Sequence, residues 1–162
     1  SSARPPAPLL AVGSLGRRQL QALAGLLAET GRRGLCRVLL IHHPPAPGSC
    51  AWRKRLTDAP QLARIIAAEG VELVLHGHTH KSARHWLATP AGQAPAIGVR
   101  SASGLGRRPG RRAQYHLHRI LPSRGGWRMQ MSVREYLSPA QGFAETATWE
   151  TALGRTAGSA GG

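Results

Sequence analysis

Apolar residues recur along the chain at two spacings, one typical of helices and one typical of strands. After Ser14 they fall three or four residues apart as far as Leu27, which predicts an amphipathic helix capped by Ser14 and ended by Gly31. Residues 36–42, CRVLLIH, form a short run rich in branched residues, which is typical of a buried strand. After an irregular, proline-rich segment over residues 1–13, the chain is thus predicted to form a helix and then a strand.

The next segment repeats both patterns. Asp58 stands where a helix cap is expected, apolar residues follow it at helical spacing, and Gly70 ends the pattern. Residues 71–75, VELVL, predict a second buried strand. Residues 36–75 therefore predict strand, loop, helix and strand, which is a βαβ unit with parallel strands and a right-handed crossover.

Strand patterns dominate the rest of the chain. We expect strands over residues 84–89 and 95–101, then a solvated basic loop over 104–112, and then a β-hairpin that turns at PSRGG. The two methionines of the hairpin are expected in the core. The apolar residues that alternate with polar neighbours in its two strands are Tyr115, Leu117, Trp127, Met129, Met131 and Val133. We expect one domain over residues 1–153 and a flexible tail over 154–162.

Two groups of histidines follow the strands of the predicted βαβ unit. His42 and His43 end the first strand, and His76, His78 and His80 follow the second. Because parallel strands end at the same edge of a sheet, topology alone brings the two groups together. Neutral imidazole is the commonest nitrogen ligand of transition metals, so His42, His78 and His80 predict a metal site.

The spacing within the second group adds detail. Residues two apart in an extended stretch project to one side, so we expect His78 and His80 to face one cavity, with Gly77 permitting a close turn that a side chain would obstruct. His76 is interpreted as a packing residue or as support for a ligand. The isolated histidines, interpreted as ordinary hydrogen-bonded residues, are His85, His116 and His118.

Composition narrows the function classes. The chain has a formal net charge of +15, and 20 of its 22 basic residues are arginine. These arginines are scattered and only 4% of residues are aromatic, so a nucleic-acid-binding surface is not favoured. No apolar run approaches the roughly 20 residues that span a bilayer, so no membrane contact is expected. Cys36 and Cys50 do not form a disulfide framework, and they indicate a reducing, cytoplasmic compartment.

Two short motifs resemble a known family. His42-His43-Pro44 and Gly77-His78-Thr79-His80 are similar to the last two of the five motifs of the calcineurin-like metallophosphoesterases. Those motifs are, in order, D-x-H, G-D-x-x-D, G-N-H-D/E, a His followed by x-P, and G-H-x-H. The resemblance covers roughly residues 9–137 and is to bacterial members, including those similar to cyclic-nucleotide phosphodiesterases.

The resemblance implies both a fold and a chemistry. The family fold is a four-layered α/β/β/α sandwich, of which this α/β chain would form the C-terminal half, a βαβ unit followed by antiparallel strands. The family centre is binuclear, with Mn, Fe or Zn, and it hydrolyses phosphate esters through a metal-bridging hydroxide. Carried over by motif, His42 and His78 would bind the second metal, and His80 the first. The motif positions that would not bind metal through their side chains are His43, Gly77 and Thr79.

The loop over residues 44–56 carries three adjacent basic residues. Arg53, Lys54 and Arg55 would border the phosphate of a substrate, and a plain solvated loop is an equal alternative.

The first three family motifs are absent from this sequence. The chain has no Asn, and its only Asp, Asp58, is expected to cap a helix. We therefore expect the missing ligands upstream of Ser1, and at most one loosely bound metal with little phosphoesterase activity in this chain alone. Losing half of a sandwich would expose a strand edge, so we also expect a need for that missing N-terminal half, or for a partner that completes the sheet.

Three alternatives stay open. The chain could be a catalytically inactive truncated remnant that acts, if at all, as a binding or structural piece. It could be a basic nucleic-acid-binding module. It could also be a mononuclear zinc hydrolase in which His42, His78 and His80 share one metal.

Overall fold

The computed structural model describes residues 11–104 and 111–154, which contain two α-helices, one short 3₁₀ helix and seven strands. In chain order the elements are α1 (Gly16–Arg32), β1 (Val38–Ile41), η1 (Trp52–Lys54), α2 (Ala59–Glu69), β2 (Leu73–His76), β3 (Ala83–Thr89), β4 (Gly92–Gly98), β5 (Gln114–Ser123), β6 (Gly126–Ser138) and β7 (Gly142–Leu153). Most of the predicted loop over 104–112 and of the predicted tail over 154–162 lies outside the described residues.

The strands form two separate sheets. The first has the order β1-β2-β4-β3, in which β1, β2 and β4 are parallel and β3 is antiparallel to β4. The second is antiparallel, with the order β5-β6-β7. The predicted parallel βαβ unit is thus confirmed as β1, α2 and β2.

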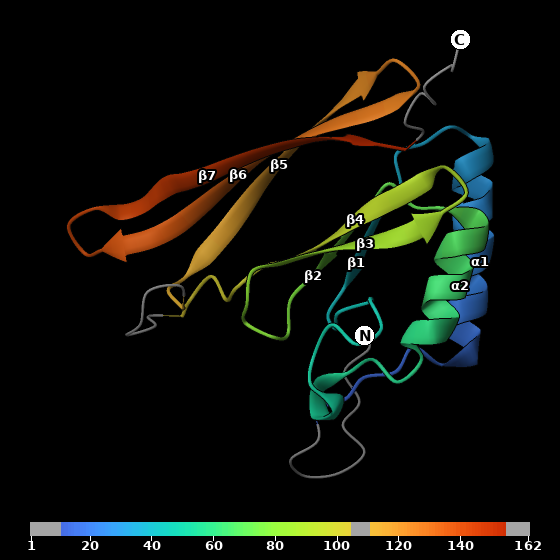
Figure 1. Ribbon diagram of the computed structural model, residues 1–162, viewed down its shortest axis with the longest axis horizontal. Coiled ribbons are helices and arrows are strands. Elements are labelled where there is room, and N and C mark those ends of the chain that lie inside the picture. Colours follow the sequence, from blue (N-terminus) through green and yellow to red (C-terminus); the bar gives the residue numbers. More distant parts are fainter. Residues whose placement is uncertain (1–10, 105–110, 155–162) are drawn as a thin grey trace.

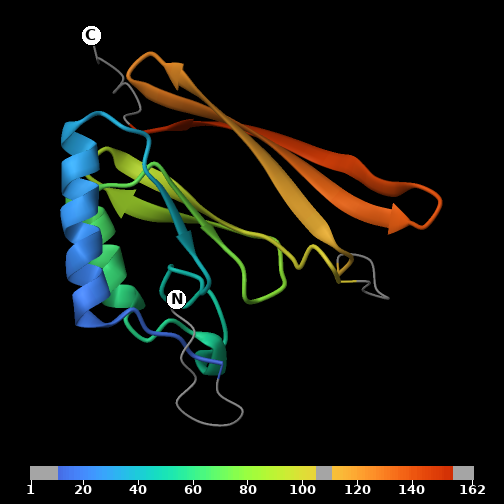
Figure 2. The same ribbon diagram turned by 180° about the vertical axis from the view of Figure 1, so that it is seen from behind.

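The helices lie against one face of the first sheet, and the second sheet lies against the other (Figures 1 and 2). Val74 and Ala96 lie in a core with the helices, where Leu62 and Ile66 of α2 are fully buried. Leu73 and Ile97 point to the opposite face, where they pack against the second sheet. The described residues therefore form a mixed α/β fold of three layers: helices, mixed sheet and antiparallel sheet.

β1 differs from the buried strand that its sequence predicts. Val38 and Leu40 are exposed, Leu40 to 73% of its surface, whereas Leu39 and Ile41 pack toward the helices. The physical reason is position: β1 is an edge strand, and the second sheet packs over β2 and β4 without covering it. Within the described residues, one edge of β1 and one of its faces are open.

The second sheet is larger than the predicted hairpin because β7 adds a third strand. The segment GFAETATWETAL is rich in Ala, Thr and Glu, and its weak alternation gives little strand signal. The predicted core positions of Met129 and Met131 are confirmed. Tyr115 and Leu117 alternate as predicted but belong to the other face, and Leu117 is exposed.

The predicted strand over residues 95–101 begins three residues earlier, at Gly92. It also ends three residues earlier than predicted, at Gly98. Proline lacks an amide donor, so it suits a strand position at which no ladder hydrogen bond is needed. In the structure Pro95 lies opposite Trp86 of β3, while the ladder to β2 begins only at Ala96. The nitrogen of Pro95 thus lies at a position where β4 pairs with β3 but not with β2.

Asp58 and Ser14, which were expected to cap α2 and α1, do not cap these helices with their side chains. Asp58 precedes α2 but makes no side-chain cap there. Its carboxylate instead accepts hydrogen bonds from the amides of Leu15 and Gly16, at 2.9 and 2.8 Å, and from the Ser14 hydroxyl. Ser14 likewise makes no side-chain cap on α1, whose N-cap residue is Leu15. A parallel bridge between Gly13 and Leu56 brings these two segments together.

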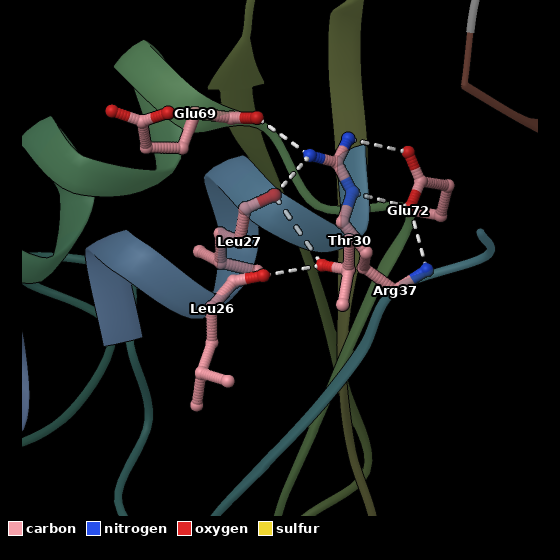
Figure 3. Close-up of polar contacts among 6 residues, drawn as sticks. All are labelled: Leu26, Leu27, Thr30, Arg37, Glu69 and Glu72. Carbon is pink, nitrogen blue, oxygen red and sulfur yellow. Dashed lines mark hydrogen bonds and ion pairs between the residues drawn. The ribbon is translucent and has the colours of Figure 1, made fainter. Parts of the chain in front are cut away.

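A buried ion pair ties the C-terminal ends of both helices to the sheet (Figure 3). Arg37 donates from Nε and Nη2 to the Glu72 carboxylate, at 2.9 and 2.7 Å. Its Nη1 donates to the carbonyls of Leu27 in α1 and Glu69 in α2. In the same view, Thr30 donates to the carbonyl of Leu26. Arg37 therefore supplies a donor to the carbonyl of Glu69, the last residue of α2, which has no partner within its own helix, and another to the carbonyl of Leu27 near the end of α1.

Two glycines leave room for the Arg37 guanidinium. A Cβ atom at Gly31 or Gly70 would lie 2.6 or 2.7 Å from its nitrogens. Gly31 was expected to end the first helix, yet α1 continues to Arg32, so the space for Arg37 explains this glycine better. Gly70 does end α2, with a φ of 84°.

Replacing Glu72 with Ala is expected to lower the free energy of unfolding by about 3 kcal/mol, because it leaves the largely buried Arg37 guanidinium without a carboxylate partner. Urea denaturation followed by circular dichroism measures this. The matched control is Glu150→Ala, which removes the half-exposed ion pair with Arg128 and should cost less than about 1 kcal/mol. Equal losses in the two variants would contradict a structural role for the Arg37–Glu72 pair.

Candidate metal site

The predicted meeting of the two histidine groups occurs at the C-terminal edge of the first sheet. The β1–β2 ladder pairs Ile41 with His76, so both strands end level with each other. The Gly77 amide then donates to the His42 carbonyl at 3.2 Å, which continues the pairing into the loops. The residues that follow the strands are therefore held side by side.

Three imidazole rings gather at this edge. His42 Nε2 lies 3.0 Å from His78 Nδ1, a distance at which one nitrogen donates a proton and the other accepts. The ring centroids of these two residues are 4.8 Å apart, and the His43 ring lies 4.2 Å from that of His78. The structure thus brings together His42 and His78 as expected, and adds His43, which was expected only as a motif position.

The environment keeps His78 in the neutral form. Burial, together with the smaller effects of the nearby charges of His43, His42 and Lys54, lowers the pKa of His78 to about 4. Its Nε2 atom is buried without a hydrogen bond of normal geometry. A neutral imidazole is the form that binds metals, so the protonation state of His78 suits a ligand at pH 7.

His80 lies apart from this cluster. Its side chain is exposed, and within the described part of the chain no hydrogen bond or ring contact joins it to the other histidines. The expectation of an extended stretch is wrong, because β2 ends at His76 and both His78 and His80 have positive φ, at 66° and 53°. Residues two apart in such a loop do not project to one side.

The backbone of this loop is strained at the histidines themselves. Among the described residues, His78 and His80 alone combine positive φ with a side chain. Gly77, expected to permit the close turn, has no positive φ, and a Cβ atom there would meet nothing within 4 Å. Left-handed conformations of residues other than glycine cost about 1–3 kcal/mol and cluster at functional sites. The strain therefore marks two of the three predicted ligands.

His43 and His76 are the two buried histidines at this edge of the sheet. His43 is 1% exposed, and its Nε2 lies 3.0 Å from the Ala11 carbonyl. His76 is also buried, and Gly98 leaves space for its ring, because a Cβ atom there would lie 2.6 Å from His76 Cε1. Burial lowers the pKa of both histidines.

The three basic residues predicted to border a phosphate lie in and after η1. Arg53 and Lys54 are exposed, and Arg55 stacks its guanidinium over the Trp52 ring, 4.4 Å from the centroid. The carbonyls of Arg53 and Arg55 accept hydrogen bonds from Ala11 and Gly13. Of the three side chains, Lys54 is the one whose charge contributes to lowering the pKa of His78.

The cluster has nitrogen donors but no carboxylate. Across residues 11–104 and 111–154, no group of three or more His, Cys, Asp or Glu is arranged to hold a metal ion. Glu72 is paired with Arg37, Glu135 with Arg100, and Asp58 with the start of α1. The described donor set therefore does not fit a binuclear centre, and it brings only two ring nitrogens, those of His42 and His78, within 3.0 Å of each other.

The remaining histidines lie elsewhere. His85 is in β3, and His116 and His118 are in β5. The last two face the intersheet core rather than solvent, and burial lowers the pKa of His116 to about 4. Because His116 and His118 are two residues apart in a strand, the sequence already indicated that they share one face, opposite to that of Leu117.

Comparisons with known proteins find no matching family model and no matching curated protein. The resemblance to metallophosphoesterases therefore stays a prediction from the two motifs. In the described part of the chain, no helix is long and apolar enough to cross a membrane.

Replacing His80 with Gly is expected to raise the free energy of unfolding by about 1 kcal/mol, because glycine adopts positive φ without strain and the exposed imidazole loses no packing. His80→Ala should give no such gain, since alanine keeps the steric conflict. Urea denaturation measures both variants.

The control for this measurement is His85→Gly in β3, where the backbone has no positive φ. This change should lower the free energy of unfolding by about 0.5–1 kcal/mol through lost strand order. If His80→Gly destabilises the protein as much as His85→Gly does, the loop at His80 is not strained.

Proposed function

We propose that this chain contributes the histidine side of a metal-dependent phosphoesterase centre that hydrolyses phosphodiesters or phosphomonoesters, cyclic nucleotides among them. The observation that carries this proposal is the 3.0 Å approach of His42 Nε2 and His78 Nδ1 at the C-terminal edge of a parallel sheet. The motifs H-H-P and G-H-T-H, which end at this same edge, give the phosphoesterase interpretation its specificity.

Each side chain has a defined part in the proposal. His42 and His78 would offer ring nitrogens to one ion, and the exposed His80 would turn toward a second ion. When bound, a metal pair of this kind acidifies water and stabilises charge on the attacking and departing oxygens. Lys54, whose charge acts on His78, and the neighbouring Arg53 and Arg55 would attract the anionic substrate.

The proposed centre needs carboxylate ligands that the described histidine cluster does not supply. A binuclear centre requires carboxylates to offset the repulsion between two cations, and the His42–His78 cluster contains none among the described residues. They would have to come from a polypeptide segment beyond these 162 residues. We propose that this segment would pair with the open edge of β1, the strand that ends next to His42, and would widen the first sheet there.

A second candidate is a catalytically inactive remnant that acts as a binding or structural piece. The same lack of carboxylates favours it. The two candidates differ in whether the histidines bind metal specifically.

Titration of the purified chain with Zn²⁺ and Mn²⁺ by calorimetry distinguishes them. We expect about one weakly bound Zn²⁺ per chain, removed by a modest excess of EDTA, and hydrolysis of bis(p-nitrophenyl) phosphate close to the buffer rate. His42→Ala or His78→Ala should abolish this binding because each removes one of two nitrogen donors.

His85→Ala is the matched control, since it removes a histidine of β3 that is not part of the cluster, and it should bind Zn²⁺ as the parent does. Unchanged binding in the His42 and His78 variants would favour the inactive remnant. Two tightly bound ions with rapid turnover would show that the chain holds a complete centre and would refute the proposed division of ligands.

A further inference from the structure

A second cluster of metal-binding side chains lies between the two sheets, away from the histidines of the first sheet. His116 and His118 belong to β5, and Met129 and Met131 belong to the adjacent β6. The register pairs His118 with Met131 and Ile120 with Met129. Because paired residues share a face, all four of these side chains lie on the core side of the sheet.

Two pairs of side chains in this cluster lie at distances compatible with a shared ion. His118 Nδ1 lies 3.3 Å from Met129 Sδ. A nitrogen and a sulfur bound to one tetrahedral ion, at roughly 2.0 and 2.3 Å from it, are about 3.5 Å apart. The His116 and His118 ring centroids are 5.8 Å apart, close to the roughly 5–6 Å of two imidazoles that share an ion.

Hydrogen bonds orient His116 for such a role. Its Nε2 lies 3.1 Å from the Gln114 amide oxygen, which also accepts a hydrogen bond from Ser82. Arg100 donates to Ser82 and is itself paired with Glu135. A ring that donates from Nε2 keeps a lone pair on Nδ1, and partners of this kind fix the orientation of histidine ligands in metal sites.

A cavity between the two sheets borders His116 and Met131 of this cluster. This cavity of about 440 Å³ is lined by His116, Met131 and Trp149 on the second sheet and by Arg84, Ile97 and Gly98 on the first. Met129 and Met131 are themselves buried, so a bound ion would be shielded from water on the sulfur side.

We propose that His116, His118, Met129 and Met131 form a binding site for a soft monovalent cation, Cu(I). Thioether sulfurs select soft ions, whereas Mg²⁺, Ca²⁺ and Mn²⁺ prefer oxygen ligands. All four ligands are uncharged, so a monovalent ion leaves less uncompensated charge in the core than a divalent one. The site is separate from the proposed phosphoesterase centre and does not depend on it.

The test uses the full chain with Cys36 and Cys50 replaced by Ser, so that thiolates do not compete for Cu(I). An anaerobic titration against bicinchoninate should show one tightly bound Cu(I) per chain. The chain contains only two methionines, and both lie in this cluster. In this background, sulfur ligands detected by X-ray absorption at the copper edge can come only from Met129 and Met131.

Replacing both methionines with Leu should lower the Cu(I) affinity by at least ~100-fold, because leucine keeps the apolar volume but lacks the sulfur donor. Circular dichroism and urea denaturation confirm that this variant is folded. The matched control is His42→Ala with His78→Ala, which removes the other histidine cluster and should bind Cu(I) as tightly as its parent.

Three results would overturn the proposal: no Cu(I) binding by the folded chain, unchanged affinity in the double leucine variant, or loss of binding in the control. In the first case the contact between His118 and Met129 is an ordinary core contact. The two proposals are tested with variants of different residues. A failure of the Cu(I) proposal therefore does not affect the phosphoesterase proposal, and a failure of the phosphoesterase proposal does not affect the Cu(I) proposal.

Discussion

The buried ion pair between Arg37 and Glu72 sets the frame on which the candidate site depends. The two residues immediately precede β1 and β2, and the Arg37 carbonyl also accepts hydrogen bonds from the amides of Glu72 and Leu73. The starts of both strands are therefore fixed against each other. Four residues later the same register brings the ends of the strands level, and the histidines follow directly. A one-residue slip would turn every side chain of β1 to the opposite face.

The seven acidic residues of the chain are used away from its histidine cluster. In a molecule of net charge +15, the acids with described contacts pair with arginines, with a serine or with a helix start. None is left at the edge where His42 and His78 meet. The fold thus uses its anions for structure, and any ion held at this edge alone must rely on uncharged nitrogen.

The topology could be predicted well from the sequence, because it follows from general rules of apolar spacing and of parallel-strand connection. Apolar spacing identified both helices and the first four strands, and parallel strand ends brought His42 and His78 together. The position of His80 could not be predicted, since it depends on left-handed backbone angles that alternation does not encode. Strand β7 was missed because Ala, Thr and Glu give a weak pattern, and the exposed face of β1 was missed because an apolar run does not show which neighbours a strand has. The partners of Asp58 lie more than forty residues away and are set by packing alone.

The placement of Asp58 and Arg37 has an electrostatic consequence for the helix pair. Asp58 binds the start of α1 and directly precedes α2, while Arg37 binds carbonyls near the ends of both helices. The two helices must therefore run in the same direction, so that their dipoles repel side by side. An anion at the positive ends and a cation at the negative ends offset that repulsion. Two single residues at opposite ends of the helix layer thus make a parallel arrangement of helices electrostatically tolerable.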